Sequence, residues 1–290
     1  MLTFLPCIDS DKMAESRKKE LQIERQDAMI LGATALAAVN RGTYFDRNRN
    51  EVDIRELLAE AVAAKVSIPP ERQLELPAEP RFETTAVRVS NETSFIAAKR
   101  WVDEGKRPLV LNFAHGTSPG GGFLTGSKAQ EEVLCRSSAL YKTLDGDAMY
   151  EAHKERPLPD STDWAIYSPD VPVFRSDAGE PLDAPWLTSF LTCAAPVVGR
   201  VSPDEAAELL HRRIERVLEI SRFLGYRSLV LGAWGCGAFK NDPIRTARSF
   251  RYHLEKRFLH AFEEIIFAIA DWSPERKTLG PFRDTFRWSD

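Results

Sequence analysis

The chain has 290 residues, 43% of them hydrophobic, and a formal net charge of −4. The apolar fraction supports a sizeable core, and the length suits one α/β domain with extensions. The negative charge argues against a protein that holds nucleic acid on a broad basic surface, and the four cysteines, which show no paired CxxC spacing, indicate neither a zinc module nor a disulfide framework.

The first eighty residues are predicted to form an N-terminal helical extension. Apolar residues recur at helical spacing over residues 17–40, and Gly42 supplies a stop just beyond. A second helix is predicted over residues 52–66. An extended linker follows, marked by four prolines: Pro69, Pro70, Pro77 and Pro80. We therefore divide the chain into an extension, residues 1–80, and a main domain, residues 81–290.

Strands alternate with helices from residue 84 onward. Residues 84–89 and 108–114 are predicted strands, and the helix between them is expected to begin at Asn91 as its N-cap and to end near residue 104. Six prolines between positions 145 and 186 argue against long regular elements there, apart from short strands at 164–167 and 171–174.

The last third of the chain continues the alternation. A buried strand is predicted over residues 190–196, and then Ser202 caps a helix in which Pro203 takes the first position and Glu205 completes a capping box. A strand at 228–233, a helix at 242–259 and a strand at 265–270 follow. This order predicts a sheet covered by helices on both faces, with ligand sites beyond the strand ends.

A glycine loop and a pair of carboxylates follow the strand that ends near residue 113. Gly120, Gly121 and Gly122 carry a large entropy cost and offer no side chain to pack, so we expect a ligand to lie against this backbone. Glu131 and Glu132 then open a helix, where acids are also favoured by the helix dipole alone. Glycines beside a helix start suit phosphate oxygens, and the carboxylates suit a bond that needs acid catalysis.

Other readings of these motifs fit less well. Residues 121–128 nearly match a P-loop, but Gly126, Ser127 and Lys128 come in the wrong order, and the second glycine loop at 232–239 lacks the GxGxxG spacing. Cys236 with His115 as base would make a thiol nucleophile, yet nothing in their spacing supports it. The five histidines show no metal-ligand pattern, so no metal is expected.

Three glycines, seven residues and then Gln-Glu-Glu, after a strand ending NFA, resemble the catalytic loop of bacterial-type poly(ADP-ribose) glycohydrolases. The segment GAWGCGAF at 232–239 resembles the second ligand loop of that family. The resemblance implies a three-layer α/β/α, macrodomain-like mixed sheet without a cofactor. Residues 145–187 resemble the family least.

The resemblance also implies the activity. The implied activity is hydrolysis of the ribose–ribose O-glycosidic bonds of poly(ADP-ribose), mainly from the chain end, with release of ADP-ribose. Glu132 would protonate the leaving ribose hydroxyl and then activate water, while Glu131 would hold the substrate or orient its neighbour. Two alternatives remain open: removal of single ADP-ribose units, and an ADP-ribose-binding module without catalysis.

The resemblance implies that the remaining site residues bind ADP-ribose, with Asn112 at the distal ribose. Phe239 follows the second glycine loop, where its ring is expected to cover a ribose, with a core aromatic as the alternative. Its partners would be poly(ADP-ribose) or an ADP-ribosylated protein, with no direct contact to DNA or membrane, and we expect a cytoplasmic monomer with a role in the DNA damage response. The expected binding residues are Asn112, Gly120, Gly121, Gly122, Gln130, Gly235, Cys236, Gly237, Ala238 and Phe239.

Overall fold

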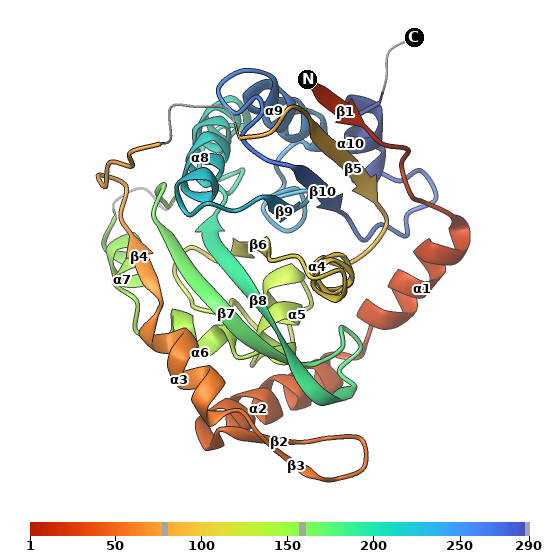
Figure 1. Cartoon of the computed structure of the whole chain (residues 1–290), viewed down its shortest axis with the longest axis vertical. Helices are drawn as coiled ribbons and strands as arrows, with labels where there is room; N and C mark the ends of the chain where they lie inside the picture. The colour runs from red at the N-terminus through yellow and green to blue at the C-terminus, as the bar shows by residue number, and fades with distance from the viewer. Residues whose placement is uncertain (77–80, 157–160, 288–290) are drawn as a thin grey trace.

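The computed structural model describes residues 1–76, 81–156 and 161–287, and Figure 1 labels its helices and strands. Within these residues, a large sheet of eight strands lies beside a small sheet of two. The strands are β1 (Leu2–Phe4), β2 (Thr43–Phe45), β3 (Glu51–Asp53), β4 (Val66–Ile68), β5 (Thr85–Ser90), β6 (Pro108–Ala114), β7 (Ala165–Arg175), β8 (Pro181–Ala194), β9 (Ser228–Leu231) and β10 (Glu264–Ala268). The helices are α1 (Asp11–Leu21), α2 (Arg25–Arg41), α3 (Arg55–Ala63), α4 (Ser94–Asp103), α5 (Gln130–Ser137), α6 (Leu140–Leu144), α7 (Ala148–Glu155), α8 (Pro203–Phe223), α9 (Pro243–Glu255) and α10 (Leu279–Thr285).

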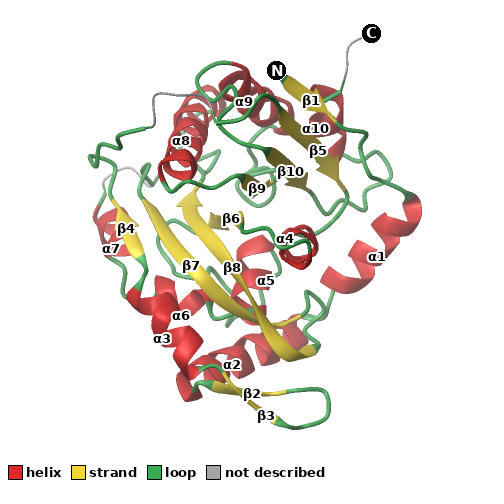
Figure 2. Ribbon diagram, viewed as in Figure 1, coloured by secondary structure: helices red, strands yellow, loops and turns green. Residues whose placement is uncertain are grey.

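The large sheet is mixed. Its strand order is β1-β5-β10-β9-β6-β8-β7-β4. Neighbours from β1 to β8 in this order pair in parallel, and β7 then pairs antiparallel with both β8 and β4. Parallel strands end at the same edge of a sheet, so the two glycine loops, which follow β6 and β9, meet at one edge (Figure 2).

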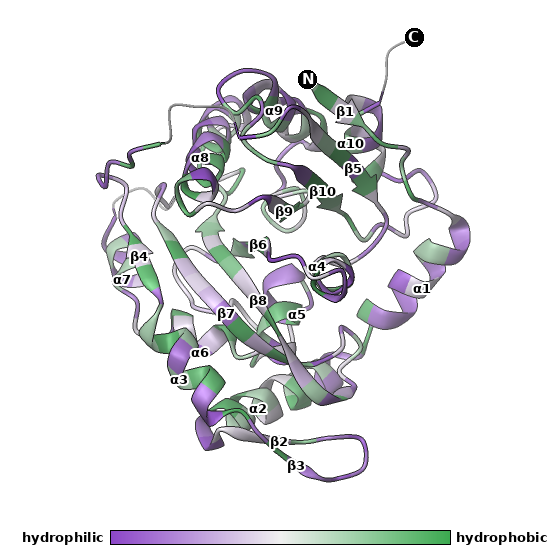
Figure 3. Ribbon diagram, viewed as in Figure 1, coloured by the Kyte–Doolittle hydropathy of each residue, from purple (hydrophilic) through white to green (hydrophobic). Residues whose placement is uncertain are grey.

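Helices cover both faces of this sheet. Leu109 and Leu111 of β6 pack into one core with α8, α9 and α10, whereas Val110 between them packs into a second core with α2 to α7. Successive side chains of a strand point to opposite faces, so β6 is buried on both sides. Figure 3 shows the hydrophobic colour over most of β10 and the hydrophilic stretches of the outlying helix α1. The predicted three-layer α/β/α fold is confirmed.

The N-terminal region is less continuous than its periodicity predicts. Instead of one helix over 17–40, α1 and α2 are separated at residues 22–24, and Gly42 ends α2 in the left-handed conformation, as predicted. Strands β1 and β4, both from the first eighty residues, form the two edges of the large sheet. The boundary near residue 80 stays a prediction, and the linker prolines Pro77 and Pro80 lie outside the described residues.

Two helix starts were predicted from capping residues. Ser202 does cap α8 through a bond from the Glu205 main-chain N–H at 3.2 Å. The N-cap of α4 is Thr93, not Asn91 as predicted, because the Thr93 hydroxyl accepts the Ile96 N–H at 3.1 Å. The Asn91 amide is used elsewhere, since it donates to Asp9 and to the main chain of the segment after β10.

The proline-rich segment holds longer strands than predicted. In place of two short strands, β7 runs over eleven residues and pairs with the fourteen residues of β8. The ladder shifts register between Ser168 and Val171, where Pro169 and the positive φ of Asp170 fall. A bulge accommodates a proline that a regular ladder would not. The prolines of this segment therefore predict shorter strands than the segment forms. Pro157 and Pro159 lie outside the described residues.

Candidate active site

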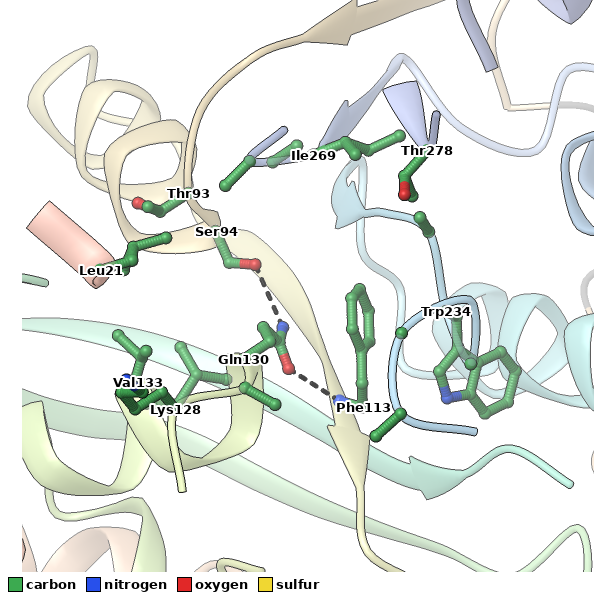
Figure 4. A pocket seen from close by; sticks show the side chains of 18 of the residues that line it. Leu21, Thr93, Ser94, Phe113, Lys128, Gln130, Val133, Trp234, Ile269 and Thr278 are labelled. Atoms are coloured by element: carbon green, nitrogen blue, oxygen red, sulfur yellow. Dashed lines mark hydrogen bonds between the residues drawn. The ribbon is translucent and has the colours of Figure 1, made fainter. Parts of the chain in front are cut away.

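Gln130 fixes the start of α5 against the end of β6. Its Oε1 accepts the Phe113 main-chain N–H at 2.9 Å, and its Nε2 donates to the Leu111 carbonyl at 2.8 Å and to Ser94 Oγ at 3.1 Å. Figure 4 shows this bridge between Ser94 and Phe113. The side chain predicted to bind ADP-ribose therefore has its polar atoms occupied within the protein, and it positions the carboxylates that follow.

Glu131 is buried in the wall of the carboxylate-lined cavity described below. Its Oε2 accepts the His115 main-chain N–H at 2.6 Å, and its Oε1 accepts from Asn112 Nδ2 at 3.3 Å. Asn112 itself is fully buried and donates also to Thr192 Oγ1. Burial, with a smaller contribution from the charge of Glu132, raises the pKa of Glu131 to about 8. Glu131 is therefore largely protonated at neutral pH.

Glu132 has one oxygen held and one without a partner. The Gly122 main-chain N–H donates to its Oε1 at 2.9 Å. Its Oε2 is buried and has no hydrogen-bond partner among the described residues. An unsatisfied carboxylate oxygen is costly to bury, so a substrate group that pairs with it would be bound with a gain in free energy.

The first glycine loop is shaped around these carboxylates. Gly121 has φ +56°, and a Cβ there would overlap Glu132 Oε1 and lie 3.1 Å from Glu131 Oε2. A Cβ at Gly122 would overlap the Ser127 hydroxyl, and one at Gly120 would lie 2.9 Å from the Phe123 ring. Both carboxylates thus converge on one glycine, although side chains of adjacent helical residues diverge, and they do so with different partners.

The second glycine loop, residues 232–239, faces the first. Gly235 has φ +77°, and its Cβ position is crowded by Asn241, whereas Gly237 has no heavy atom within 4 Å of its Cβ position. Cys236 contacts Thr246 Oγ1 at 3.5 Å, and burial raises the pKa of its thiol to about 12, which does not suit a nucleophile. The Phe239 carbonyl accepts a bond from the segment that follows β8.

Two cavities meet between these loops. The carboxylate cavity, of about 790 Å³, is bounded by residues 115–118 and 121–122, by Glu131 and Glu132, and by the end of the second loop. The apolar cavity, of about 380 Å³, lies between Phe113, the second loop and the segments after β5 and β10 (Figure 4). They share five residues along their common border: Phe113, Lys128, Ala129, Ala238 and Phe239.

The predicted residues differ in which cavity they line. Gly121, Gly122, Glu131 and Glu132 line the carboxylate cavity, Gln130, Gly235 and Gly237 line the apolar one, and Ala238 and Phe239 line both. Gly120, Asn112 and Cys236 lie behind these walls rather than on them. Contact between these predicted residues and ADP-ribose stays a prediction.

Most of the apolar cavity was not predicted. Leu21 at the end of α1, Ile269 after β10 and Thr278 before α10 line it, far apart in the sequence and without a shared motif. Asp177 is also on its wall, where Oδ2 accepts the Thr93 hydroxyl at 2.7 Å and burial raises the pKa to about 6. Its Oδ1 has no partner among the described residues.

The described part of the chain has neither a metal-ligand cluster nor a membrane-spanning helix. No group of three or more His, Cys, Asp or Glu side chains there is placed to hold a metal ion. None of the helices in residues 1–76, 81–156 and 161–287 has the length and apolar character to cross a bilayer.

Comparison with known proteins identifies the class. The family model described as the microbial-type PARG catalytic domain, where PARG is poly(ADP-ribose) glycohydrolase, matches residues 32–176. A PARG from Thermomonospora curvata is 35% identical, with a TM-score of 0.83 over 90% of this chain and 99% of the other. A PARG from Deinococcus radiodurans in complex with ADP-ribose is 39% identical, with a TM-score of 0.73 over 79% and 96%.

A further structure of the Thermomonospora curvata enzyme, bound to the inhibitor ADP-HPD, is 36% identical with a TM-score of 0.82 over 89% and 99% of the two chains. No curated protein sequence matches significantly. The fold and site are those of a macrodomain-like hydrolase. The chain belongs to the microbial-type poly(ADP-ribose) glycohydrolase family.

Proposed function

We propose that the chain hydrolyses the ribose–ribose O-glycosidic bonds of poly(ADP-ribose), mainly from the chain end, and releases ADP-ribose. The observation that carries this proposal is the state of Glu132. One of its oxygens is held by Gly122, and the other is unpartnered beside a cavity that continues into a second, apolar one. This arrangement suits an elongated ligand with an acid-labile bond at one end.

The two cavities suggest how one ADP-ribose unit would lie. The apolar cavity suits the adenine, with Asp177 as an acceptor for its amino group. The diphosphate would cross the shared border at Ala238, next to Gly237, which leaves open space beside the backbone. The terminal ribose would then lie in the carboxylate cavity between Phe239 and Glu132.

Glu132 would act twice in this geometry. As the bond between the anomeric carbon and the leaving oxygen breaks, the electron pair stays on that oxygen and the proton of Glu132 moves to it. The same carboxylate then takes a proton from the water that attacks the anomeric carbon. Glu131 would serve as a neutral positioning group, because its raised pKa leaves only a small charge beside the reacting carboxyl.

The proposal includes the macromolecular substrate and the cellular setting of the reaction. We expect poly(ADP-ribose) or ADP-ribosylated protein as the macromolecular substrate, handled in the cytoplasm by a monomer and linked to the DNA damage response. The net charge of −4 argues against a broad basic surface that would hold DNA, so a polyanionic polymer would be bound locally, at the cavity.

The test is incubation of the purified chain with poly(ADP-ribose), with products sized by chromatography over time. Free ADP-ribose that forms while the remaining polymer shortens gradually supports cleavage from the end. Early fragments of intermediate length would contradict end cleavage. An intact polymer, together with release of ADP-ribose from mono-ADP-ribosylated protein, would replace the proposal with single-unit removal.

A further inference from the structure

His115 is a half-buried residue of the carboxylate cavity, and it follows directly on strand β6. The Thr117 main-chain N–H donates to its Nδ1 at 3.3 Å, and the Thr117 hydroxyl lies 3.4 Å from the same nitrogen. A ring nitrogen that accepts a hydrogen bond from a main-chain N–H carries no proton, so the neutral ring has its proton on Nε2. Burial also lowers the pKa of His115, which favours this neutral form.

Within residues 1–76, 81–156 and 161–287, no partner is found for the Nε2–H donor. Among the described residues, the hydrogen bonds of the His115 ring all involve Nδ1. The main-chain N–H of His115 meanwhile donates to Glu131, so the residue is fixed to the carboxylate pair. An unused donor on a fixed ring in a cavity is a group available to a ligand.

The place of His115 shows which part of the ligand it can meet. Its ring packs edge to face with Phe239, with 6.4 Å between the ring centroids. Phe239 borders both cavities, whereas His115 lines only the carboxylate cavity, together with Thr117, Ser118 and Arg200. With the adenine in the apolar cavity and the terminal ribose at Glu132, the part of the carboxylate cavity lined by these four residues is left for the group across the scissile bond.

We propose that the part of the carboxylate cavity formed by His115, Thr117, Ser118 and Arg200 is the subsite for the leaving nucleotide unit of the polymer, and that His115 Nε2–H donates to the leaving ribose oxygen. This inference rests on the proposed glycohydrolase function. Arg200 supplies positive charge beside His115, where the diphosphate of the leaving unit would pass.

The proposed bond acts in the step that breaks the glycosidic bond. The electron pair of that bond goes to the leaving oxygen, and Glu132 gives this oxygen its proton. His115 gains and loses no proton, since its Nε2–H stabilises the partial negative charge on the oxygen until proton transfer is complete. A donor of this kind, aimed at developing charge, contributes roughly 100-fold in rate.

The experiment compares two leaving groups in His115→Phe and His115→Gln variants. Phenylalanine keeps a ring against Phe239 but has no donor, and glutamine keeps an N–H near the position of Nε2. Each variant is assayed on poly(ADP-ribose) and on an aryl ADP-riboside whose nitrophenolate leaves without help. The control is His260→Gln, a histidine in the connection that enters β10, at the opposite edge of the sheet.

We expect His115→Phe to lose roughly 100-fold in kcat on the polymer but no more than about threefold on the aryl substrate. The Kd for ADP-ribose should be unchanged, and His115→Gln should recover most of the loss. Equal losses on both substrates, or no loss on the polymer, would overturn the inference.

Two controls separate this inference from other failures. A wild type that leaves the polymer intact refutes the proposed function, whatever the variants do, whereas an active wild type with an unaffected His115→Phe refutes only the leaving-group subsite. If His115→Phe does not fold, His115→Asn replaces it, because the asparagine amide reaches only the Nδ1 position. If the kcat of His115→Asn on the polymer then equals that of His115→Gln, the inference is overturned.

Discussion

Gly121 determines where Glu132 can lie. Any larger residue would place its Cβ on Glu132 Oε1, and its φ of +56° belongs to the region that glycine adopts readily. The sequence suggests that a ligand lies against this backbone. In the structure, what lies against it is the carboxylate itself, and the next residue, Gly122, donates the hydrogen bond that holds it.

We predict that Gly121→Ala abolishes most activity by displacing Glu132. A shift of about 1 Å in a reacting group can cost on the order of 100-fold in rate. Gly146→Ala is the matched control, because Gly146 has φ +72° and no heavy atom within 4 Å of its Cβ position. Both variants should lose roughly 1–2 kcal/mol of stability to backbone strain. Equal kcat values for the two variants would refute the prediction.

Glu131 makes the stability of the folded chain depend on pH. Its pKa is raised to about 8 in the folded chain from 4.5. Between these values the folded chain binds a proton that the unfolded chain does not, so wild-type stability falls as pH rises from about 4.5 to 8.

Glu131→Gln removes this titration. We predict that the urea concentration at the midpoint of unfolding increases for Glu131→Gln, compared with wild type at the same pH, as the pH rises from 5 to 8. Glu151→Gln serves as the control, because Glu151 is exposed on α7. Midpoint differences that stay constant with pH would show that Glu131 does not titrate in this range.

At the scale of elements, local sequence signals predict the strands and helices near the site better than the short elements at the edges of the fold. Strand β6 and helix α8 were placed closely, because an apolar run and a Ser-Pro cap act within a few residues. Strand β1 and helix α10 were not predicted. Short elements of this kind are stabilised by pairing and packing with distant segments, and no periodicity reports that.

The two edge strands lead to a prediction about domain organisation. β1 pairs with β5, and β4 pairs with β7, so removal of residues 1–80 would leave both inner strands with unpaired edges. We predict that residues 81–290 alone do not fold into a soluble, cooperative unit. Circular dichroism and size-exclusion chromatography beside the full chain test this. A soluble fragment with a cooperative unfolding transition would show instead that the extension is dispensable.

For the whole molecule, the carboxylate cavity was predictable and most of the apolar cavity was not. Glu131, Glu132 and the two glycine loops are dense local motifs that carry a family resemblance. The apolar cavity gathers Leu21, Thr93 and Thr278 from segments that only the folded sheet brings together. The sequence indicates no role for His115 beyond that of a base for Cys236, because its bond to Thr117 and its contact with Phe239 exist only in the folded chain.

The most direct test of the central claim, that Glu132 supplies and recovers the proton, is a comparison of Glu132→Gln with Glu131→Gln. We predict that Glu132→Gln loses about 100-fold to 10,000-fold in kcat on poly(ADP-ribose) while ADP-ribose still binds, as measured by calorimetry. Glu131→Gln, which resembles the protonated carboxyl in shape and charge, should lose much less. A Glu132→Gln variant that retains near wild-type kcat, or the reverse order of losses, would contradict the account.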